Sequence, residues 1–511
     1  MTILENSFVY CLLAGLWQRF FVLWDGCATH ALCQRIGLWV RRKAQESVIC
    51  DTVWREGALS RRWKTSLTRA LADWVLNLPC ALVKWLHGAL GGVWEGSFFL
   101  RTLTAWGGSA FFFLGLFMLA MLVAPHSLWN NAYGFLGALA VTAMYLLGCA
   151  AKPRRTLQVD VFGPYMIFYL LCIFNALSCS LATSLSIRFF LFHAAAFLLA
   201  LLAVNAVEKL EDLRIAIALA VFGITVAAVY GCYQGYVGVE VVASLQDMAL
   251  NKGMPGRVYS LFDNANNFAE LLVMLIPLDI GLLFSSKTWK GRFACLVALV
   301  PCVISIGQTY SRSGWIGLAL AMCVFIALTN WRLVPPLIVL GVAAIPFLPT
   351  TIYNRILTIG NTKDSSTQYR FAIYEAVGTL MKDYWFKGVG LGTDALKKAF
   401  DAYPTMFDGN HPIHAHNNYL QMWVETGIIG FLAYLAMLAY TVKSGVKAFY
   451  ASADKRLRYV LSAAIASLCG ILVISLAEYT WFYPRNMFTY WFLLGIIMAC
   501  VKLGRKEQPA A

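Results

Sequence analysis

Charged residues are scarce in this sequence, and acidic residues are the scarcer kind. Only 13% of its 511 residues are Asp, Glu, Lys or Arg, whereas a soluble protein of this length carries about 25%. Hydrophobic residues make up 60% of the chain, and the mean hydropathy is +0.65. These values exclude an ordinary soluble domain and indicate a protein that is largely embedded in a membrane.

Paired cysteine spacings are also missing. The 14 cysteines follow no regular pattern, and many lie inside apolar runs, for example Cys149, Cys302 and Cys469. A cysteine in such a run behaves as a small hydrophobic residue. We therefore expect neither a disulfide framework nor a zinc site of the cysteine type.

The positive charge of the chain is not accompanied by a nucleic-acid-binding motif. Lys and Arg number 41 against 26 Asp and Glu, for a formal net charge of +15. A nucleic-acid binder needs a soluble basic domain with a recognisable motif, so we expect no such partner. Basic residues that hold cytoplasmic loops in place account for the excess. The first residues, MTILENSFVY, lack the basic n-region of a cleavable signal peptide, and we expect them to be retained.

Long apolar runs, in contrast, are abundant. Runs of about 20 apolar residues match a hydrocarbon core roughly 30 Å thick. They are continuous rather than alternating, which separates a helical bundle from a transmembrane β-barrel. The sequence therefore predicts an all-α integral membrane protein with about 12 transmembrane helices. The expected spans are 107–124, 132–150, 162–184, 187–206, 213–237, 267–284, 292–308, 313–329, 333–350, 419–441, 458–477 and 486–502.

The loops predict an orientation. With residues 1–106 inside and the spans alternating, Lys and Arg gather in the inside loops, and the first outside loop, 125–131, has none. Two outside segments, 239–266 and 351–418, exceed ordinary loop lengths, and long loops in compact proteins are often functional. Within the second, apolar residues at helical spacing predict a helix over 368–382, and the sequence GVGLG breaks the chain after it.

Residues 1–106 differ from the rest of the chain. They contain twelve Lys and Arg against seven acidic residues, with tryptophans throughout. Short apolar runs beside basic residues and Trp favour interfacial amphipathic helices on an anionic leaflet, although a cytoplasmic tail would share this composition. A further span over 8–24 would be interrupted by Gln18 and Arg19. Residues 504–511 are expected to form a cytoplasmic tail.

Several arginines fall on the predicted outside, against the general bias. Arginine stays charged and binds phosphate oxygens with two N–H groups, and near a membrane it is costly and therefore often functional. For Arg312 and Arg370 a phosphate-binding role is the preferred interpretation. For Arg257 and Arg485, phosphate binding and a structural role in snorkelling or loop capping are equally good interpretations. Arg355 lies in the same long loop as Arg370.

Three histidines crowd at the start of the expected tenth span, in GNHPIHAHNNYLQMWVETGIIG (409–430). Histidine titrates near neutrality, so His416 is a candidate general base for a hydroxyl group. His411, His414 and His416 together form an alternative metal site, but spacings of three and two residues give no strong zinc pattern. We therefore expect no metal.

Neighbouring polar residues are candidates for supporting roles. Asn417 follows His416 directly, and His414 lies two residues before it. Glu375 and Glu425 are possible alternative bases. For Glu425, two helical turns after His416, a role in helix contacts is the preferred interpretation.

Five stretches resemble the O-antigen ligase and O-antigen polymerase superfamily of bacterial membrane glycosyltransferases. The similarity covers about 107–503, and its most specific elements are S-R-S and H-x-H-N with the long loop between them. The stretches are GRVYSLFDNANNFAELL (256–272), TYSRSGWIGLALA (309–321), QYRFAIYEAVGTLMKDYWFKGVGLGTDAL (368–396), HAHNNYLQMWVETGIIGFLAYL (414–435) and WFYPRNMFTYWFLLGI (481–496).

The resemblance implies a twelve-span bundle with a large extracytoplasmic loop in the bacterial cytoplasmic membrane. It implies an undecaprenyl-diphosphate-linked glycan as donor, a glycan, lipid or protein hydroxyl as acceptor, and no nucleotide sugar, cofactor or metal. The family's two functional arginines correspond to Arg312 and Arg370, and its essential histidine corresponds to His416. The basic region 1–106 departs from the family, in which the spans begin near the N-terminus.

Two other functions fit a protein with many spans. A transporter of polysaccharide or of a lipid-linked glycan is the main alternative, but it would favour internal repeats and charges in mid-span, and the polar residues here gather at the outer face. A sensor whose long loop binds a ligand would need a signalling domain, for which only 1–106 is available. A glycosyltransferase is the preferred interpretation.

Overall fold

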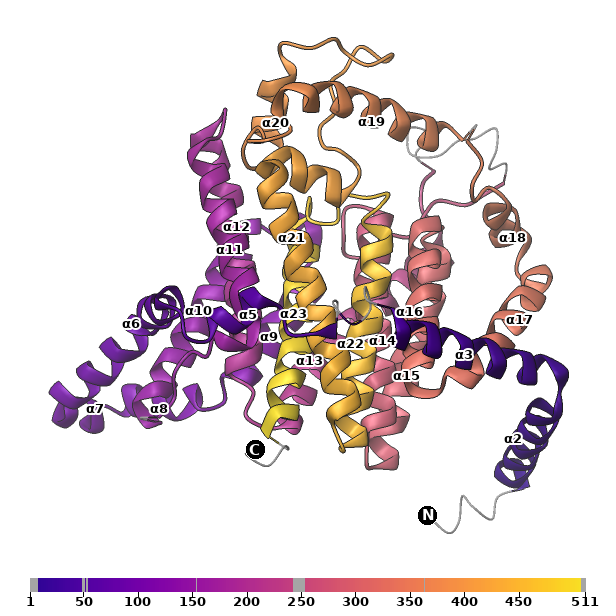
Figure 1. Ribbon diagram of the computed structural model, residues 1–511, viewed down its shortest axis with the longest axis horizontal. Coiled ribbons are helices and arrows are strands. Elements are labelled where there is room, and N and C mark those ends of the chain that lie inside the picture. Colours follow the sequence, from indigo (N-terminus) through magenta and orange to yellow (C-terminus); the bar gives the residue numbers. More distant parts are fainter. Residues whose placement is uncertain are drawn as a thin grey trace. The chain divides into compact units, whose positions relative to one another are not determined.

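The computed structural model of the protein describes residues 8–47, 51, 54–152, 154–241, 253–362 and 364–506. Every regular element in these residues is a helix, which confirms the predicted all-α fold (Figure 1). Residues 1–7, the middle of the predicted outside segment (242–252) and the end of the predicted tail (507–511) lie outside the described residues. By its internal contacts the chain divides into two units, Met1–Thr65 and Ser66–Ala511.

In the described residues of the first unit, the helices are α2 (Phe8–Gly26), α3 (Ala28–Glu46) and α5 (Ala58–Trp63). The imidazole of His30 is buried and lies 3.4 Å from the carboxylate of Asp25, which fixes the turn between α2 and α3. α2 does not reach the hydropathy of a membrane span, in line with the interruption expected at Gln18 and Arg19.

The second unit begins with α6 (Leu67–Ala89), α7 (Gly91–Gly96) and α8 (Phe98–Gly107). The side chain of Asn77 exchanges two hydrogen bonds with the backbone of Leu157, at 2.8 and 3.0 Å. The ammonium of Lys84 donates to the carbonyl of Arg155 at 2.7 Å. The part of region 1–106 from residue 66 onward therefore packs with the bundle, while the role proposed for the region stays a prediction.

The bundle is organised around two buried helices, α14 (Ala265–Ser285) and α23 (Pro484–Lys506). Large side chains that no solvent reaches, such as Tyr490 and Trp491 of α23, fill its centre. The surrounding helices are α9 (Ala110–Val123), α10 (Asn131–Ala151), α11 (Gly163–Ser178), α12 (Thr183–Asn205), α13 (Leu210–Val237), α15 (Trp289–Gln308), α16 (Arg312–Asn330), α17 (Val334–Ala344), α21 (Asn418–Ala451) and α22 (Lys455–Ile474).

The described residues contain 10 helices that are long and apolar enough to cross a membrane, or 11 if the bent pair Phe98–Gly107 and Ala110–Val123 is one span. The predicted count of twelve is therefore not confirmed. The expected spans 313–329 and 333–350 lie in one segment of consecutive helices, Arg312–Phe347, of 36 residues, in which the backbone leaves the helical conformation at Asn330 (φ −155°, ψ 84°). A span needs only about 20 residues, and a 3₁₀ turn (Trp331–Leu333) separates α16 from α17 within this segment.

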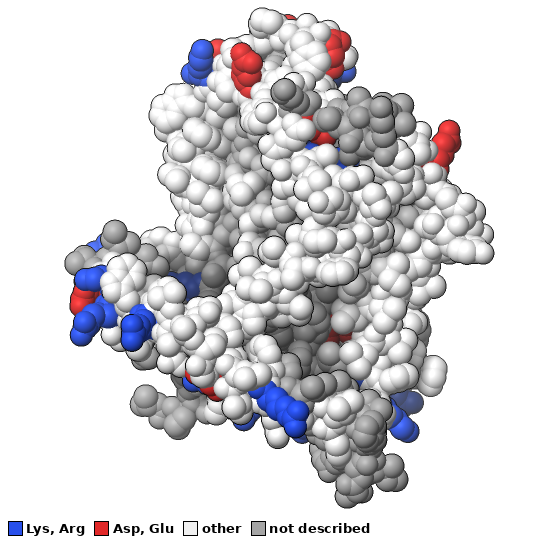
Figure 2. All heavy atoms as spheres, turned by 90° about the vertical axis from the view of Figure 1, so that its right-hand side faces the viewer, with Lys and Arg blue, Asp and Glu red and all other residues white. Residues whose placement is uncertain are grey.

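Between this segment and α21 lies a helical cap over one end of the bundle, residues 350–417 (Figure 1). It contains α18 (Thr350–Leu357), α19 (Ser365–Tyr384) and α20 (Thr393–Phe400), so the helix expected over 368–382 is present. Its own small core includes Ile373, Leu380 and Leu396. Figure 2 shows acidic and basic atoms over this end of the protein and a wide band below it with few charged atoms.

The sequence GVGLG forms a strap, residues 388–392, that fixes the cap to the bundle. The three glycines of the strap have φ values of +71°, +104° and +87°, which L-residues with side chains rarely adopt. The amides of Val389 and Gly390 donate to the carbonyls of Val424 and Glu425 at 2.8 and 3.2 Å. α21 is kinked at Gly427, which has a φ of +69° within the helix, and this kink leaves the two carbonyls able to accept these bonds.

A methyl group at Gly427 should therefore loosen the cap. Its Cβ would lie 2.0 Å from the carbonyl oxygen of Phe386, in a backbone conformation that alanine adopts poorly. We expect Gly427→Ala to destabilise the protein by about 2 kcal/mol or more, seen as a lower melting temperature in detergent. Gly378→Ala is the matched control, because a Cβ there meets nothing within 4 Å and alanine favours a helix by up to about 1 kcal/mol. Equal melting temperatures for the two variants would contradict this role of Gly427.

Candidate active site

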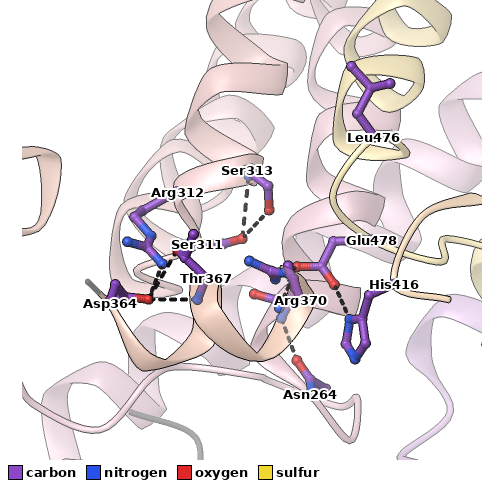
Figure 3. A network of polar contacts seen from close by, with 12 residues as sticks. Asn264, Ser311, Arg312, Ser313, Asp364, Thr367, Arg370, His416, Leu476 and Glu478 are labelled. Atoms are coloured by element: carbon purple, nitrogen blue, oxygen red, sulfur yellow. Dashed lines mark hydrogen bonds and ion pairs between the residues drawn. The ribbon is translucent and has the colours of Figure 1, made fainter. Parts of the chain in front are cut away.

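Arg312 opens α16 and points toward the cap. The hydroxyl of Ser311, the N-cap residue, accepts the Gly314 amide. The guanidinium of Arg312 donates to the Asp364 carboxylate at 2.8 Å and to the Thr358 carbonyl at 3.0 Å (Figure 3). Only 13% of the Arg312 side chain is exposed. A span of the bundle and the cap are thus joined through one charged side chain.

The carboxylate of Asp364 receives several groups at once. It caps α19 by accepting from the Thr367 amide, and it is buried, with 1% of its side chain exposed. The guanidinium of Arg355 in α18 lies 3.9 Å from its second oxygen. Burial, and then the nearby charge of Arg312, lower the pKa of Arg355 to about 10, so it remains protonated at neutral pH. Asp364 therefore holds two cations in a pocket from which water is largely excluded.

Arg257 contributes a charge that its hydrogen-bond acceptors do not neutralise. Its guanidinium donates to the Thr309 carbonyl at 2.8 Å and to the side-chain oxygen of Asn266, and both acceptors are neutral. Burial lowers the pKa of Arg257 to about 10, which still leaves it protonated. A buried cation with neutral acceptors has a strong preference for an anionic ligand.

Glu478 joins Arg370 to His416. This residue lies between α22 and α23, and its carboxylate is within 2.5 Å of the Arg370 guanidinium and 3.5 Å of Nδ1 of His416. Asn266 adds a hydrogen bond of 3.0 Å to the same carboxylate. Figure 3 shows Glu478 between the two side chains. Because Asn266 also accepts from Arg257, the network extends across four segments that lie far apart in the sequence.

Glu478 is ionised despite its position. Burial alone raises the pKa of the Glu478 carboxyl, but the charge of Arg370, the contact with His416 and the charge of Arg257 outweigh burial, and the pKa is lowered. An ionised partner at Nδ1 favours the tautomer whose proton lies on Nδ1 and leaves Nε2 with a lone pair. The described residues offer no hydrogen bond to Nε2, so this nitrogen is available to a substrate.

The backbone holds His416 in an unusual conformation. Its φ is +44°, in the left-handed region that residues other than glycine seldom occupy. The hydroxyl of Tyr374 in α19 donates to the His416 carbonyl at 3.2 Å, and the amide of Asn418 donates to the Ser475 carbonyl at 2.8 Å. These contacts fix the loop beside Glu478. Strain at such a position is typical of functional sites.

His414 supports His416 as a neutral group. Its Nδ1 accepts the His416 amide at 3.2 Å, and the two rings lie 4.2 Å apart between their centroids. Burial, followed by the proximity of His416, lowers the pKa of His414 to about 3. His414 therefore carries no charge near neutral pH, and the two rings do not repel each other as cations.

The remaining predicted residues lie outside this network. Arg485 donates to the Ala124 carbonyl at 2.7 Å and lies over the ring of Phe262. Asn417 caps α21. Glu425 is buried and accepts from Gln421 at 2.8 Å and from Tyr479 at 3.2 Å. Glu375 is exposed on α19.

The three histidines do not converge. The ring of His411 stacks on Phe400 of the cap core, whereas His414 and His416 face the network. Among the residues that the structure describes, no group of three His, Cys, Asp or Glu side chains could hold a metal ion.

Sequence reasoning missed Glu478, Asp364 and Asn266. The signals were weak but present. Asp364 precedes S-S-T at the start of a predicted helix, as an N-cap residue does, and Glu478 is an acidic residue at the edge of an apolar run, where charge is costly. Only the folded structure shows that these residues face Arg312, Arg370 and Arg257.

The fold and the site together define a class of protein. It is a multi-pass helical membrane protein with an arginine-rich polar site at one end of the bundle, beneath a helical cap. Residues 294–435 match the family model described as O-Antigen ligase, and this match confirms the superfamily resemblance. It indicates an O-antigen ligase or polymerase type of membrane glycosyltransferase. A search of curated proteins gave no match to the chain. The matched segment contains Arg312, Arg370 and His416 but ends before Glu478.

Replacing Glu478 should reveal its influence on His416. Without its carboxylate, the ring of His416 loses its orienting partner, so we expect Glu478→Gln to lower the rate of glycan transfer at least about tenfold. The measurement is the transfer rate of the purified variant in vesicles, beside its melting temperature. An unchanged transfer rate with a merely lower melting temperature would mean that Glu478 is structural only.

Proposed function

We propose that the protein transfers a glycan from an undecaprenyl-diphosphate-linked donor to an acceptor hydroxyl, on the outer face of the bacterial cytoplasmic membrane. Arg312 and Arg370 bind the diphosphate with support from Arg257, and His416 is the general base. The observation that carries this proposal is the network in which Arg370, Glu478 and His416 are joined. It puts a cation for the leaving group and a base for the acceptor in one site.

The chemistry requires little beyond these groups. The acceptor oxygen attacks the anomeric carbon as its proton passes to Nε2 of His416, and the bond between that carbon and the diphosphate oxygen breaks. Undecaprenyl diphosphate leaves with the bonding electrons, and the arginines stabilise the charge that develops on it. A single displacement inverts the anomeric centre. Glu478 stabilises the imidazolium that forms, as a carboxylate does beside a catalytic histidine.

The contacts of Arg370 and Arg257 support a role in binding the diphosphate. Arg370 keeps one nitrogen, Nε, buried without a hydrogen-bond partner among the described residues, and this group is suited to a phosphate oxygen. Arg257 has only neutral acceptors. Both arginines are therefore arranged to receive an additional anion.

A reconstituted transfer assay tests the proposal. Purified protein in vesicles receives an undecaprenyl-diphosphate glycan and candidate acceptors, and the products are separated by size. A ladder of repeats supports a polymerase, and one transfer to a lipid or protein acceptor supports a ligase. If the glycan lipid only crosses the vesicle membrane without any transfer, the protein is a transporter and the proposal is wrong.

A further inference from the structure

A basic pocket lies at the opposite end of the bundle from the cap. α23 begins near the candidate active site and, over 23 residues, extends about 35 Å to this pocket. Figure 1 shows the C-terminal end of α23 and the α19–α20 cap at opposite ends of this unit. The pocket has a volume of about 260 Å³ and is lined by Tyr145, Lys152, Arg154, Arg155, Thr156, Gln158, Asn205, Glu208, Lys502 and Lys506.

Arg155 gives this pocket a buried cation with unused donors. Its side chain is 6% exposed. One nitrogen, Nη1, donates to the Gly107 carbonyl at 2.8 Å. The other two, Nε and Nη2, are buried without a hydrogen-bond partner in the part of the chain that the structure describes, although Nη2 lies 4.0 Å from Glu208. Two free N–H directions on a guanidinium fit two oxygens of a phosphate.

The charge of the lining is strongly positive. Five of its side chains are Lys or Arg, and Glu208 is the acidic residue among them. That carboxylate is engaged by Lys152 at 2.7 Å. Lys502 is buried, and its ammonium donates to two carbonyls, those of Val204 and Val207. The pocket therefore gathers cations that the protein itself does not fully neutralise, which favours an anionic ligand.

A larger hollow of about 790 Å³ adjoins the pocket and leads to α6. The two share Lys502 and Lys506, and the hollow is also lined by Trp74 and Asn77 of α6. Its two carboxylates, Asp73 and Asp160, form ion pairs with Arg69. The residues of α6 beyond it form an apolar stripe at helical spacing, each more than 40% exposed: Leu67, Leu71, Trp74, Leu78 and Leu82. Cations suited to a phosphate thus lie next to an exposed apolar helix face. This arrangement matches a phospholipid, which has an anionic headgroup and apolar acyl chains.

We propose that this basic pocket binds the phosphate of an anionic phospholipid, with the acyl chains along the apolar stripe of α6. The site is separate from the donor site and is independent of the proposed function. A soluble phosphate shares the headgroup chemistry, but the stripe favours the lipid. Since Lys and Arg mark the cytoplasmic side, the lipid belongs to the inner leaflet.

Native mass spectrometry of the delipidated full-length protein tests this site. The probes are phosphatidylglycerol and zwitterionic phosphatidylcholine, each added at equal concentration. Lys152→Gln with Arg154→Gln removes two charges at the rim without touching the buried Arg155, whose own Arg155→Gln variant risks the contact to Gly107. The matched control is Lys287→Gln with Lys290→Gln, two exposed lysines of the same predicted side that lie outside the pocket.

We expect wild type and control to bind phosphatidylglycerol in preference to phosphatidylcholine, and the rim variant to bind it at least about fivefold less. Equal binding of the two lipids by wild type, or equal phosphatidylglycerol binding by the rim and control variants, would overturn the proposal. Pyrophosphate distinguishes a soluble phosphate from a phospholipid headgroup as the ligand. If it raises the melting temperature of wild type but not of the rim variant, and phosphatidylglycerol has no such effect, the ligand is a soluble phosphate and the lipid assignment is wrong.

Discussion

Replacing His416 with alanine is expected to lower glycan transfer by about 10²- to 10⁴-fold, the usual contribution of a positioned general base. The Nδ1 of this ring lies 3.5 Å from Glu478, and no described residue forms a hydrogen bond with its Nε2. Donor affinity should change little, because the arginines remain. The measurement is the rate of transfer by protein in vesicles, with donor binding measured separately.

A second variant removes the concern that alanine disturbs the loop. Asparagine tolerates the left-handed backbone at position 416 better than most residues do, so His416→Asn should fold as wild type and still be inactive. His411→Asn is the control, since this ring stacks on Phe400 away from Glu478. Normal transfer by His416→Asn would refute the base assignment. Loss of transfer by His411→Asn as well would point to a shared role of the histidines, as in a metal site.

Replacing Arg370 or Arg312 with alanine is expected to raise the donor KM about 10- to 150-fold. This range corresponds to 1.5–3 kcal/mol for a hydrogen bond to a charged group. Loss of Arg370 also leaves Glu478 buried without its closest cation, so the maximal rate should fall too. Lysine in either position should restore only part of the affinity, because an ammonium lacks the two-pronged geometry of a guanidinium.

Arg188 offers a matched control for these variants. It forms an ion pair with Asp394 of the cap at 2.8 Å, as Arg312 does with Asp364, but 58% of its side chain is exposed. Exposed pairs of this kind contribute about 0.2–1 kcal/mol, so Arg188→Ala should leave the donor KM unchanged. If Arg312→Ala and Arg370→Ala behave like Arg188→Ala, the diphosphate is bound elsewhere.

The membrane spans were predictable because each is specified locally. The runs that form α12, α13 and α14 are long, continuous and apolar. Such a run can be buried against lipid or against any other helix, so its formation does not depend on one specific partner. The prediction was less accurate where tertiary contacts decide the result. The expected spans 313–329 and 333–350 are joined only by a 3₁₀ turn, Trp331–Leu333, and the kink of α21 at Gly427 depends on the strap, which lies more than 30 residues earlier in the chain.

The candidate site was predictable by residue type but not by pairing. Arg312, Arg370 and His416 stand out because ionisable groups at a membrane edge are costly. Nothing in the local sequence indicates that Glu478 lies between Arg370 and His416, since 108 residues separate it from the first. Asp364 likewise follows an ordinary capping pattern, and its bond to Arg312 is a property of the fold alone.

The left-handed backbone conformation of His416 lowers the stability of the protein at a position that its proposed activity requires. An L-residue with a side chain loses about 1–2 kcal/mol in this conformation relative to glycine, so a chain optimised for thermal stability alone would replace this histidine early. Engineering for thermal stability with general stabilising substitutions would therefore tend to select an inactive protein. Position 416 should be held fixed in any such effort.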